Sequence, residues 1–262
     1  IGSVLAMGEI LKGMGKTARL AIEGGLPEKY EFLREEITLT DSRNTDGSSK
    51  FDKVIVLDSG TFERIGESAS LIDEDAEILN IDHHPTNDNY GNINFVDSSA
   101  SSTCELIFRV IKELGIPLSR EIAVYLYIGI VTDTGRFRFS NSSPEAFSIS
   151  SELVQAGAEP ADLEEKIYFD LPRNYINALA KSLTSLEFYD DGRIVLMKYL
   201  EDEEIEDSEG FIDFALGIRM AEAAIFIRKN PGDGKLKISL RSRNSLDVQE
   251  IASYYGGGGH KK

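Results

Sequence analysis

The sequence predicts an α/β protein in which a mainly parallel sheet flanked by helices is followed by a smaller C-terminal α/β domain. Two short apolar runs, "KVIVLDSG" and "EILNIDHH", are rich in valine, isoleucine and leucine, and a helix-like stretch separates them. Strands of this kind usually belong to parallel sheets that are covered on both faces. The sequence pattern changes beyond residue 187, where strand-like segments flank an acidic run. This change predicts a second domain.

The first half of the chain alternates helix-like and strand-like segments. The opening stretch, "IGSVLAMGEILKGMG", has apolar residues at helical spacing, so we expect a helix already under way at Ile1. "KTARLAI" predicts a strand. The strand in "KVIVLDSG" ends at Asp58, and a short helical stretch near "ERIGESASL" leads to "EILNIDHH". These two strands are therefore expected to be consecutive in the sheet.

The two helices that follow carry clear end signals. In "SSTCELIFRVIKELGIPLS", Ser102 and Glu105 have the spacing of a capping box, and Gly115 suits the C-terminal cap. Ser119 can cap the next helix, "REIAVYLYIGIVTD". We expect that helix to end near Asp133.

The remaining elements divide the chain into domains. A helix is predicted from Pro144 to Gln155, and the helical "PRNYINALAKSL" is typical of a connector. Beyond it, "RIVLMKYL" and "KLKISLRSR" are strand-like and "AEAAIF" is helix-like, while the acidic "EDEEIEDSE" is interpreted as a solvated loop or helix start. We expect domains at residues 1–171 and 188–262, joined by a connector helix at 172–187.

The composition of the 262 residues limits the function classes. Apolar residues make up 41% of the chain, which is enough for a core. A formal charge of −17 argues against a protein that coats long duplex nucleic acid, because that task needs a broad basic face. A local basic pocket can still hold a small anionic ligand.

The single cysteine, Cys104, excludes an internal disulfide and a cysteine-rich zinc site, and we expect it to be buried. The longest apolar run, "AVYLYIGIV", is far shorter than the roughly 20 residues that span a bilayer. No membrane partner is therefore expected, and a cytoplasmic location is the default.

Candidate metal-binding side chains follow both predicted strands. Asp58 comes directly after the first strand. Asp82, His83 and His84 come at the end of the second, although the whole chain has only three histidines. Ligands bind beyond the carboxyl ends of parallel strands, and consecutive strands are usually neighbours, so these side chains should lie at one rim. Asp133, within "VTDTGRFRF", could reach the same rim. Carboxylate and imidazole donors without thiolate suit Mn²⁺, Mg²⁺ or Co²⁺ better than structural zinc.

Each of these residues also has a purely structural interpretation. A single aspartate after a strand, such as Asp58, is commonly a turn former or a helix cap. Asp133, which lies between two threonines, could likewise be a cap. The adjacent His83 and His84 are harder to explain in this way. Neighbouring side chains of an extended backbone point to opposite sides, so one could bind metal while the other meets the substrate.

The C-terminal segment "YYGGGGHKK" places the third histidine directly after four glycines. Upstream, Leu236, Ile238 and Leu240 share one face of a predicted strand, whereas Arg241 and Arg243 share the other. A glycine-rich turn that exposes backbone N–H groups beside two guanidinium groups is a candidate anion cradle. The alternatives are a flexible linker for the glycines and a solvated strand face for the arginines.

Together these stretches resemble the DHH/DHHA1 phosphoesterase family over nearly the whole chain. "IGSVLAMG" is similar to the segment after the family's first motif, "VLDSG" to the second motif, "IDHHPTN" to the third and "GIVTDTGRF" to the fourth. "SLRSRNSLDVQEIASYYGGGGHKK" is similar to the DHHA1 signature. The resemblance implies an N-terminal DHH domain with a mainly parallel sheet, a smaller α/β DHHA1 domain with a mixed sheet, and an active-site cleft between them.

The resemblance also implies a role for each candidate residue. Asp58 would bridge two divalent ions, usually Mn²⁺, and His83 and Asp133 would complete the protein ligands of the second ion. Asp82 would not bind the metal itself but would hold other side chains of the site in the right orientation. His84 would contact the scissile phosphate or assist the leaving oxygen. The far end of the substrate would be held by Arg241, Arg243, Gly256, Gly257, Gly258, Gly259 and His260.

The family's first motif, a His-x-x-x-Asp-x-Asp run, would precede Ile1, where the chain begins. The resemblance implies that this run supplies most ligands of the first ion. We expect the natural protein to contain it, because a sheet that lost its first strand would not be expected to stay folded. The alternative is a fragment that binds metal poorly and is inactive. The DHHA1 part also stops soon after His260.

The expected protein is a metal-dependent phosphodiesterase and phosphatase. Its expected substrates are short single-stranded oligoribonucleotides, linear dinucleotides such as pApA, or 3′-phosphoadenosine 5′-phosphate (pAp), cleaved by a water that two metal ions activate. Long RecJ-type exonucleases carry extra domains and family II pyrophosphatases lack the "GGGGH" element, which favours the small-nucleotide branch. The alternative is a nucleotide-binding regulator without catalysis, and two aspartates before Ile1 would indicate the enzyme. The sequence does not fix the oligomeric state, and a homodimer is compatible with it.

Overall fold

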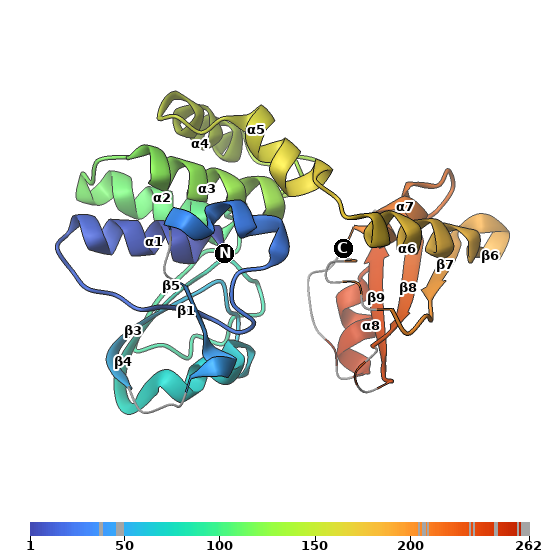
Figure 1. Ribbon diagram of the computed structural model, residues 1–262, viewed down its shortest axis with the longest axis horizontal. Helices are drawn as coiled ribbons and strands as arrows, with labels where there is room; N and C mark the ends of the chain where they lie inside the picture. The colour runs from blue at the N-terminus through green and yellow to red at the C-terminus, as the bar shows by residue number, and fades with distance from the viewer. Residues whose placement is uncertain are drawn as a thin grey trace. The chain divides into compact units, whose positions relative to one another are not determined.

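The structure, a computed structural model, describes residues 1–36, 39–45, 50–203, 205, 208, 210–230, 232, 234–243, 246–255 and 257. The chain divides into two compact units, Ile1–Asp170 and Leu171–Lys262 (Figure 1). The first unit contains parallel sheets and the second a mixed sheet. The predicted α/β class is therefore confirmed.

The central sheet of the first unit is fully parallel, in the order β3-β4-β5. Its strands are β3 (Phe51–Leu57), β4 (Ile72–Asp82) and β5 (Ile93–Val96). A separate parallel pair is formed by β1 (Leu20–Ile22) and β2 (Leu39–Asp41). Leu57 pairs with Ile81, and Asp82 with Val96, so β3, β4 and β5 end at the same edge of the sheet. The residues that follow β3 and β4 are thereby brought side by side.

Helices supply most of the core of the first unit. The α-helices are α1 (Gly2–Gly13), α2 (Thr103–Leu114), α3 (Arg120–Asp133), α4 (Pro144–Gln155) and α5 (Pro160–Glu164). The 3₁₀ segments are η1 (Glu28–Glu36), η2 (Ser42–Asn44) and η3 (Phe62–Leu71), and η4 (Glu165–Phe169) is a π-helix. The α3 helix is nearly enclosed by other elements, because residues on all of its faces are buried, among them Ala123, Leu126 and Ile130. This burial explains why the sequence of α3 is apolar over most of its length.

The predicted helix ends in this unit are confirmed. The hydroxyl of Ser102 accepts a hydrogen bond from the Glu105 N–H, and Gly115 closes α2 in the left-handed conformation, with φ +64°. Ser119 caps α3 in the same way as Ser102 caps α2. Cys104 is buried within α2, and burial raises the pKa of its thiol. These caps fix the start of α2 and the course of α3, both of which border the site described below.

The second unit is a four-stranded mixed sheet in the order β6-β7-β8-β9. Its strands are β6 (Glu187–Tyr189), β7 (Ile194–Tyr199), β8 (Ala223–Lys229) and β9 (Leu236–Ser242). Its helices are α6 (Arg173–Thr184), α7 (Phe211–Gly217), α8 (Val248–Tyr254) and the short η5 (Asp190–Gly192). The α6 helix, which falls in the expected connector, buries Ala178 in the core of this unit.

The prediction of a helix at "AEAAIF" is wrong, because Ala223–Lys229 forms strand β8. Alanine favours helices, but this segment pairs with β7 on one side and β9 on the other. Ala224 and Phe226 are buried against the helices of the unit. Pairing on both edges and burial of one face outweigh the local helix preference.

None of the helices in the described part of the chain combines the length and the hydrophobicity that crossing a bilayer requires.

Candidate active site

Asp58 lies immediately after β3 in a strained backbone conformation. Its φ angle is +63°, a region that aspartate tolerates better than most residues but still occupies rarely. Its backbone N–H donates to the Ile81 carbonyl at 3.1 Å, and its Oδ1 accepts a hydrogen bond of 2.9 Å from the Thr103 hydroxyl. Backbone strain of this kind persists where the surroundings hold it, and it is commonly found at functional sites.

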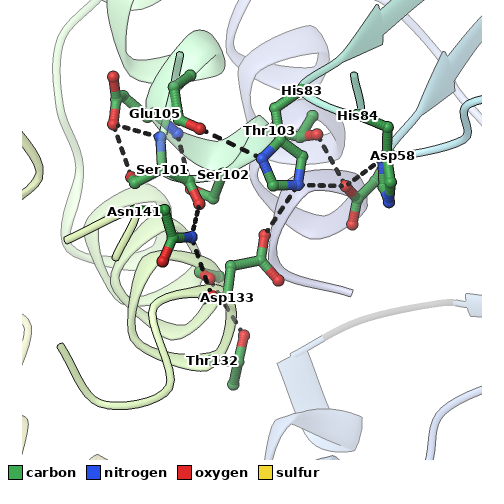
Figure 2. Close-up of polar contacts among 12 residues, drawn as sticks. Asp58, His83, His84, Ser101, Ser102, Thr103, Glu105, Thr132, Asp133 and Asn141 are labelled. Carbon is green, nitrogen blue, oxygen red and sulfur yellow. Dashed lines mark hydrogen bonds and ion pairs between the residues drawn. The ribbon is translucent and has the colours of Figure 1, made fainter. Parts of the chain in front are cut away.

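His83 lies between two carboxylates. Its Nε2 is 3.6 Å from Oδ1 of Asp58 and 3.6 Å from Oδ2 of Asp133. Figure 2 shows the imidazole ring between these two side chains, which come from the end of β3 and the end of α3. Nδ1 of His83 contacts the Ala100 carbonyl oxygen at 3.3 Å. Three side chains from distant parts of the sequence therefore meet at one point.

The chemistry of this group fits a bound cation. A carbonyl oxygen can only accept, so Nδ1 of His83 carries a hydrogen, and Nε2 is the ring nitrogen that faces the two carboxylates. Carboxylate oxygens and an imidazole nitrogen that converge on one point are donors that divalent cations such as Mn²⁺ and Mg²⁺ take. Within the described residues, Asp58, His83 and His84 also form a set whose ligand atoms all lie within 4.8 Å of one another. The site can therefore hold a metal ion.

His84 is turned toward a different partner from His83. Its Nδ1 lies 2.7 Å from Oδ1 of Asp82 and 4.0 Å from Oδ1 of Asp58. Burial alone lowers the pKa of His84, but the hydrogen bond to Asp82 and its negative charge outweigh burial and leave the pKa raised. Burial likewise acts to raise the pKa of Asp82, yet the hydrogen bonds from His84 and Asn87 leave it lowered. The pair therefore favours an imidazolium beside a carboxylate.

Asp133 is the last residue of α3, and its side chain points back toward the sheet edge (Figure 2). Its backbone carbonyl accepts a hydrogen bond of 3.1 Å from Nδ2 of Asn141, and the same amide donates to the Ser101 carbonyl at 2.8 Å. Burial, together with the negative charge of Asp58, raises the pKa of Asp133 to about 8. The two carboxylates are thus held close together, on either side of the His83 ring.

The five residues predicted for the N-terminal site, Asp58, Asp82, His83, His84 and Asp133, are all brought together by the fold. The C-terminal group is described only in part. Its members Gly256, Gly258, Gly259 and His260 lie outside the described residues. The backbone N–H of Gly257 donates to the Ala252 carbonyl at 2.8 Å.

The two arginines of β9 and its end differ in their surroundings. Arg241 forms an ion pair of 2.6 Å with Asp213 of α7. Arg243 is exposed, and its backbone N–H donates to the Glu222 carbonyl at 2.7 Å. Leu236 and Ile238 lie on the opposite strand face from Arg241, as the alternation predicts, but that face is exposed in this unit. The apolar residues of β9 are thus not part of the core of the second unit.

Several residues beside the site were not singled out by the sequence pattern. Thr103 holds Asp58, and Asn87 contacts Asp82 at 2.6 Å. Asn80, inside β4, is fully buried and bonded to Tyr90. The available signal for Asn80 was a polar amide within the apolar end of the strand, between Leu79 and Ile81, since buried amides need specific partners.

Comparison with known proteins agrees with this geometry. Residues 1–130 match the DHH family, N-terminal domain, and residues 195–262 match the DHHA1 domain. The chain belongs to the DHH family of phosphoesterases.

Two curated relatives and one solved structure illustrate the similarity. The chain is 32% identical to the bifunctional oligoribonuclease and PAP phosphatase of Thermus thermophilus, over 99% of this chain and 77% of that protein. It is 30% identical to the protein of the same description from Bacillus subtilis, over 90% of this chain and 75% of the relative. The crystal structure of an exopolyphosphatase-related protein from Bacteroides fragilis matches with a TM-score of 0.89 and 27% identity, covering 100% of this chain and 81% of that one.

Proposed function

We propose that the protein hydrolyses phosphate esters in short oligoribonucleotides, in linear dinucleotides of the pApA type or in pAp, with two divalent cations that are normally Mn²⁺. The observation that carries the proposal is the convergence of Asp58, His83 and Asp133 at the carboxyl edge of the sheet. The names of the Thermus and Bacillus relatives, each an oligoribonuclease and PAP phosphatase, support the same substrate class.

In this proposal Asp58, His83 and Asp133 hold the metal. Carboxylate and imidazole donors suit Mn²⁺, Mg²⁺ or Co²⁺. Such cations would lower the pKa of a bound water and stabilise the attacking and leaving oxygens. The ligand atoms of His84 and Asp58 also lie within 4.8 Å of each other. We nevertheless assign His84 to the substrate, because its Nδ1 is bonded to Asp82 at 2.7 Å.

Three other side chains of the site have separate roles in the proposed reaction. Asp82 holds Nδ1 of His84, and we assign Nε2 to the contact with the scissile phosphate. The raised pKa of His84 favours a proton on Nε2, which can pass to the leaving oxygen. Thr103 keeps the Asp58 carboxylate directed at His83 through its 2.9 Å hydrogen bond.

The second domain would supply the binding site for a remote phosphate. We assign this role to residues 188–262 and the bond-breaking site to residues 1–171, with 172–187 as the connecting segment. The groups proposed to bind the phosphate are Arg241, Arg243, Gly256, Gly257, Gly258, Gly259 and His260. Binding a charge far from the broken bond would favour substrates long enough to present one, namely pAp and short oligonucleotides.

The test is a substrate panel with the full-length natural protein and Mn²⁺. The panel contains pApA, pAp, a long single-stranded RNA and bis-p-nitrophenyl phosphate, each measured as kcat/KM. We expect Mn²⁺-dependent hydrolysis, with pApA and pAp far above the long RNA. Tight nucleotide binding without any hydrolysis would contradict the proposal and indicate a nucleotide-binding regulator instead.

A further inference from the structure

Both oxygens of the Asp82 carboxylate are occupied by side chains from one short segment. Oδ1 lies 2.7 Å from Nδ1 of His84, and Oδ2 accepts a hydrogen bond of 2.6 Å from Nδ2 of Asn87. Asp82 is fully buried, so solvent does not compete for either oxygen. A buried carboxylate with one partner on each oxygen has little freedom to rotate.

The amide of Asn87 can meet Asp82 in only one orientation. Its Oδ1 accepts a hydrogen bond of 2.7 Å from the Asn89 backbone N–H, which leaves Nδ2 as the end that faces Asp82. The Asn87 backbone N–H also donates to the His84 carbonyl at 3.2 Å, which closes the turn after the histidine pair. Asn87 therefore presents only donor hydrogens to the carboxylate.

A second set of hydrogen bonds also holds the side chain of Asn87. Its Nδ2 reaches Oδ1 of Asn80 at 2.8 Å, and Nδ2 of Asn80 reaches the Tyr90 hydroxyl at 3.0 Å. The Tyr90 hydroxyl donates to the Ser59 carbonyl at 3.2 Å, next to Asp58. Burial raises the pKa of Tyr90 to about 12, so this hydroxyl keeps its hydrogen at neutral pH. The chain of contacts thus links the residues after β3 to the turn after β4.

We propose, building on the function proposed above, that Asn87 is a positioning residue that fixes the orientation of the His84 ring through Asp82. The amide of Asn87 holds Oδ2 of Asp82, which keeps Oδ1 directed at Nδ1 of His84. Nδ1 of His84 must then carry a hydrogen, and Nε2 becomes the nitrogen that faces the reacting phosphate. A simpler role, in which Asn87 only closes the turn, predicts no effect on the ring of His84.

The experiment compares Asn87→Ala and Asn87→Asp with a matched control, Asn94→Ala. Asn94 lies in β5, and its amide bonds the carbonyls of Asn89 and Gly91 in the connection between β4 and β5 without reaching Asp82. Removal of Asn94 therefore loosens the connection and leaves the proposed contact in place. Tyr90→Phe, which removes one hydroxyl from the second set of contacts, is a milder variant in case the Asn87 variants fold poorly.

Two readouts are needed, one of them independent of activity. The first is the ¹⁵N chemical shift of the His84 ring nitrogens, recorded without Mn²⁺ to avoid paramagnetic broadening. The chain has only three histidines, so His84→Ala identifies the signals by their loss. The second readout is kcat and KM on pApA together with bound Mn²⁺.

In the parent protein we expect the ¹⁵N shift of Nδ1 of His84 to report an N–H that is hydrogen-bonded to Asp82. In both Asn87 variants the Nδ1 signal of His84 should shift, because Asp82 is no longer held in place by Asn87. We expect kcat to fall about 10- to 100-fold, the range typical of residues that orient others in a site, with KM and bound Mn²⁺ nearly unchanged. Tyr90→Phe should change both readouts in the same direction by less. Asn94→Ala should lower the melting temperature and leave both readouts at the parent values.

An unchanged His84 ring in Asn87→Ala would overturn the inference, as would a loss of kcat no larger than in Asn94→Ala. If the parent protein hydrolysed none of the nucleotides, the proposed function would fail. The ring signals of the same variants would still decide whether Asn87 positions His84.

Discussion

The hydroxyl of Thr103 donates a hydrogen bond of 2.9 Å to Oδ1 of Asp58, although 45 residues separate them in the sequence. The same oxygen lies 3.6 Å from Nε2 of His83. The first residue of α2 therefore helps to aim the carboxylate that follows β3. The cap formed by Ser102 fixes where α2 starts, and so fixes where the Thr103 hydroxyl lies.

Thr103→Val should weaken metal binding without unfolding the protein. Valine keeps the shape of threonine but cannot hold Asp58, so we expect the Kd for Mn²⁺ to rise about 10-fold or more. The measurement is a calorimetric titration with Mn²⁺. Thr184→Val, at an exposed helix end of the second unit, removes a hydroxyl that bonds only the Lys181 carbonyl among the described contacts and should change nothing. An unchanged Kd in Thr103→Val would show that Asp58 does not depend on Thr103.

Asp97→Asn should flatten the dependence of stability on acid pH. The hydrogen bonds from Ser99, followed by that from Arg109, hold the pKa of Asp97 at about 2. A carboxyl with a lowered pKa stabilises the fold above its unfolded pKa, and this contribution is lost as the pH falls from about 4 toward 2. The side chain is one third exposed, so solvent screening keeps the effect small.

The measurement for Asp97→Asn is the melting temperature between pH 6 and pH 2. The difference in melting temperature between the parent and the variant should be largest near pH 6. It should become about 2–4 °C smaller toward pH 2, the size expected for roughly 1 kcal/mol. Parallel curves over the whole range would contradict this assignment.

Gly129→Ala should destabilise the first unit. A Cβ at Gly129 would lie 2.1 Å from Sγ of Cys104, in the buried contact of α3 with α2 and α1. We expect a loss of about 1–3 kcal/mol in the free energy of unfolding, measured by urea denaturation. Gly13→Ala is the matched control, because a Cβ there meets nothing within 4 Å and should be neutral or stabilise by about 0.4–1 kcal/mol. Equal effects of the two changes would contradict this account of the helix packing.

Arg243→Ala should reduce activity on substrates that carry a second phosphate. Loss of a charge-assisted hydrogen bond of about 1.5–3 kcal/mol corresponds to roughly 10- to 150-fold in kcat/KM on pApA or pAp. Bis-p-nitrophenyl phosphate has no remote phosphate and should be cleaved at the parent rate. Arg219→Ala, another exposed arginine of this unit, serves as the control. An equal fall on all substrates would assign the second domain a supporting role only.

Local patterns predicted the elements that depend on neighbours in sequence. The strands that lead to Asp58 and Asp82 were predicted because each is a short apolar run that ends in polar side chains. The cap at Ser102 follows from residue spacing alone. The grouping of Asp58 with the DHH triplet followed from the rule that parallel strands end at one edge.

Features that depend on distant contacts were not predicted. β8 was predicted as a helix because its alanines favour one, whereas the pairing with β7 and β9 is invisible in the local sequence. The contact of Asn87 with Asp82 depends on how the turn after β4 folds back, and the Thr103 bond on where α2 begins. Such hydrogen bonds are set by three-dimensional packing and leave little periodic signal in the sequence.

The central claim is that the two adjacent histidines divide their tasks, with His83 binding metal and His84 serving the substrate. The most direct measurement is bound Mn²⁺ per chain, recorded beside kcat on pApA, for His83→Ala and His84→Ala in the full-length protein. We expect His83→Ala to lose both metal and activity, because Nε2 of His83 is the atom that faces the two carboxylates. His84→Ala should keep its Mn²⁺ while kcat falls about 10²- to 10⁴-fold, as for the loss of a general acid. Equal loss of Mn²⁺ in the two variants would contradict the claim.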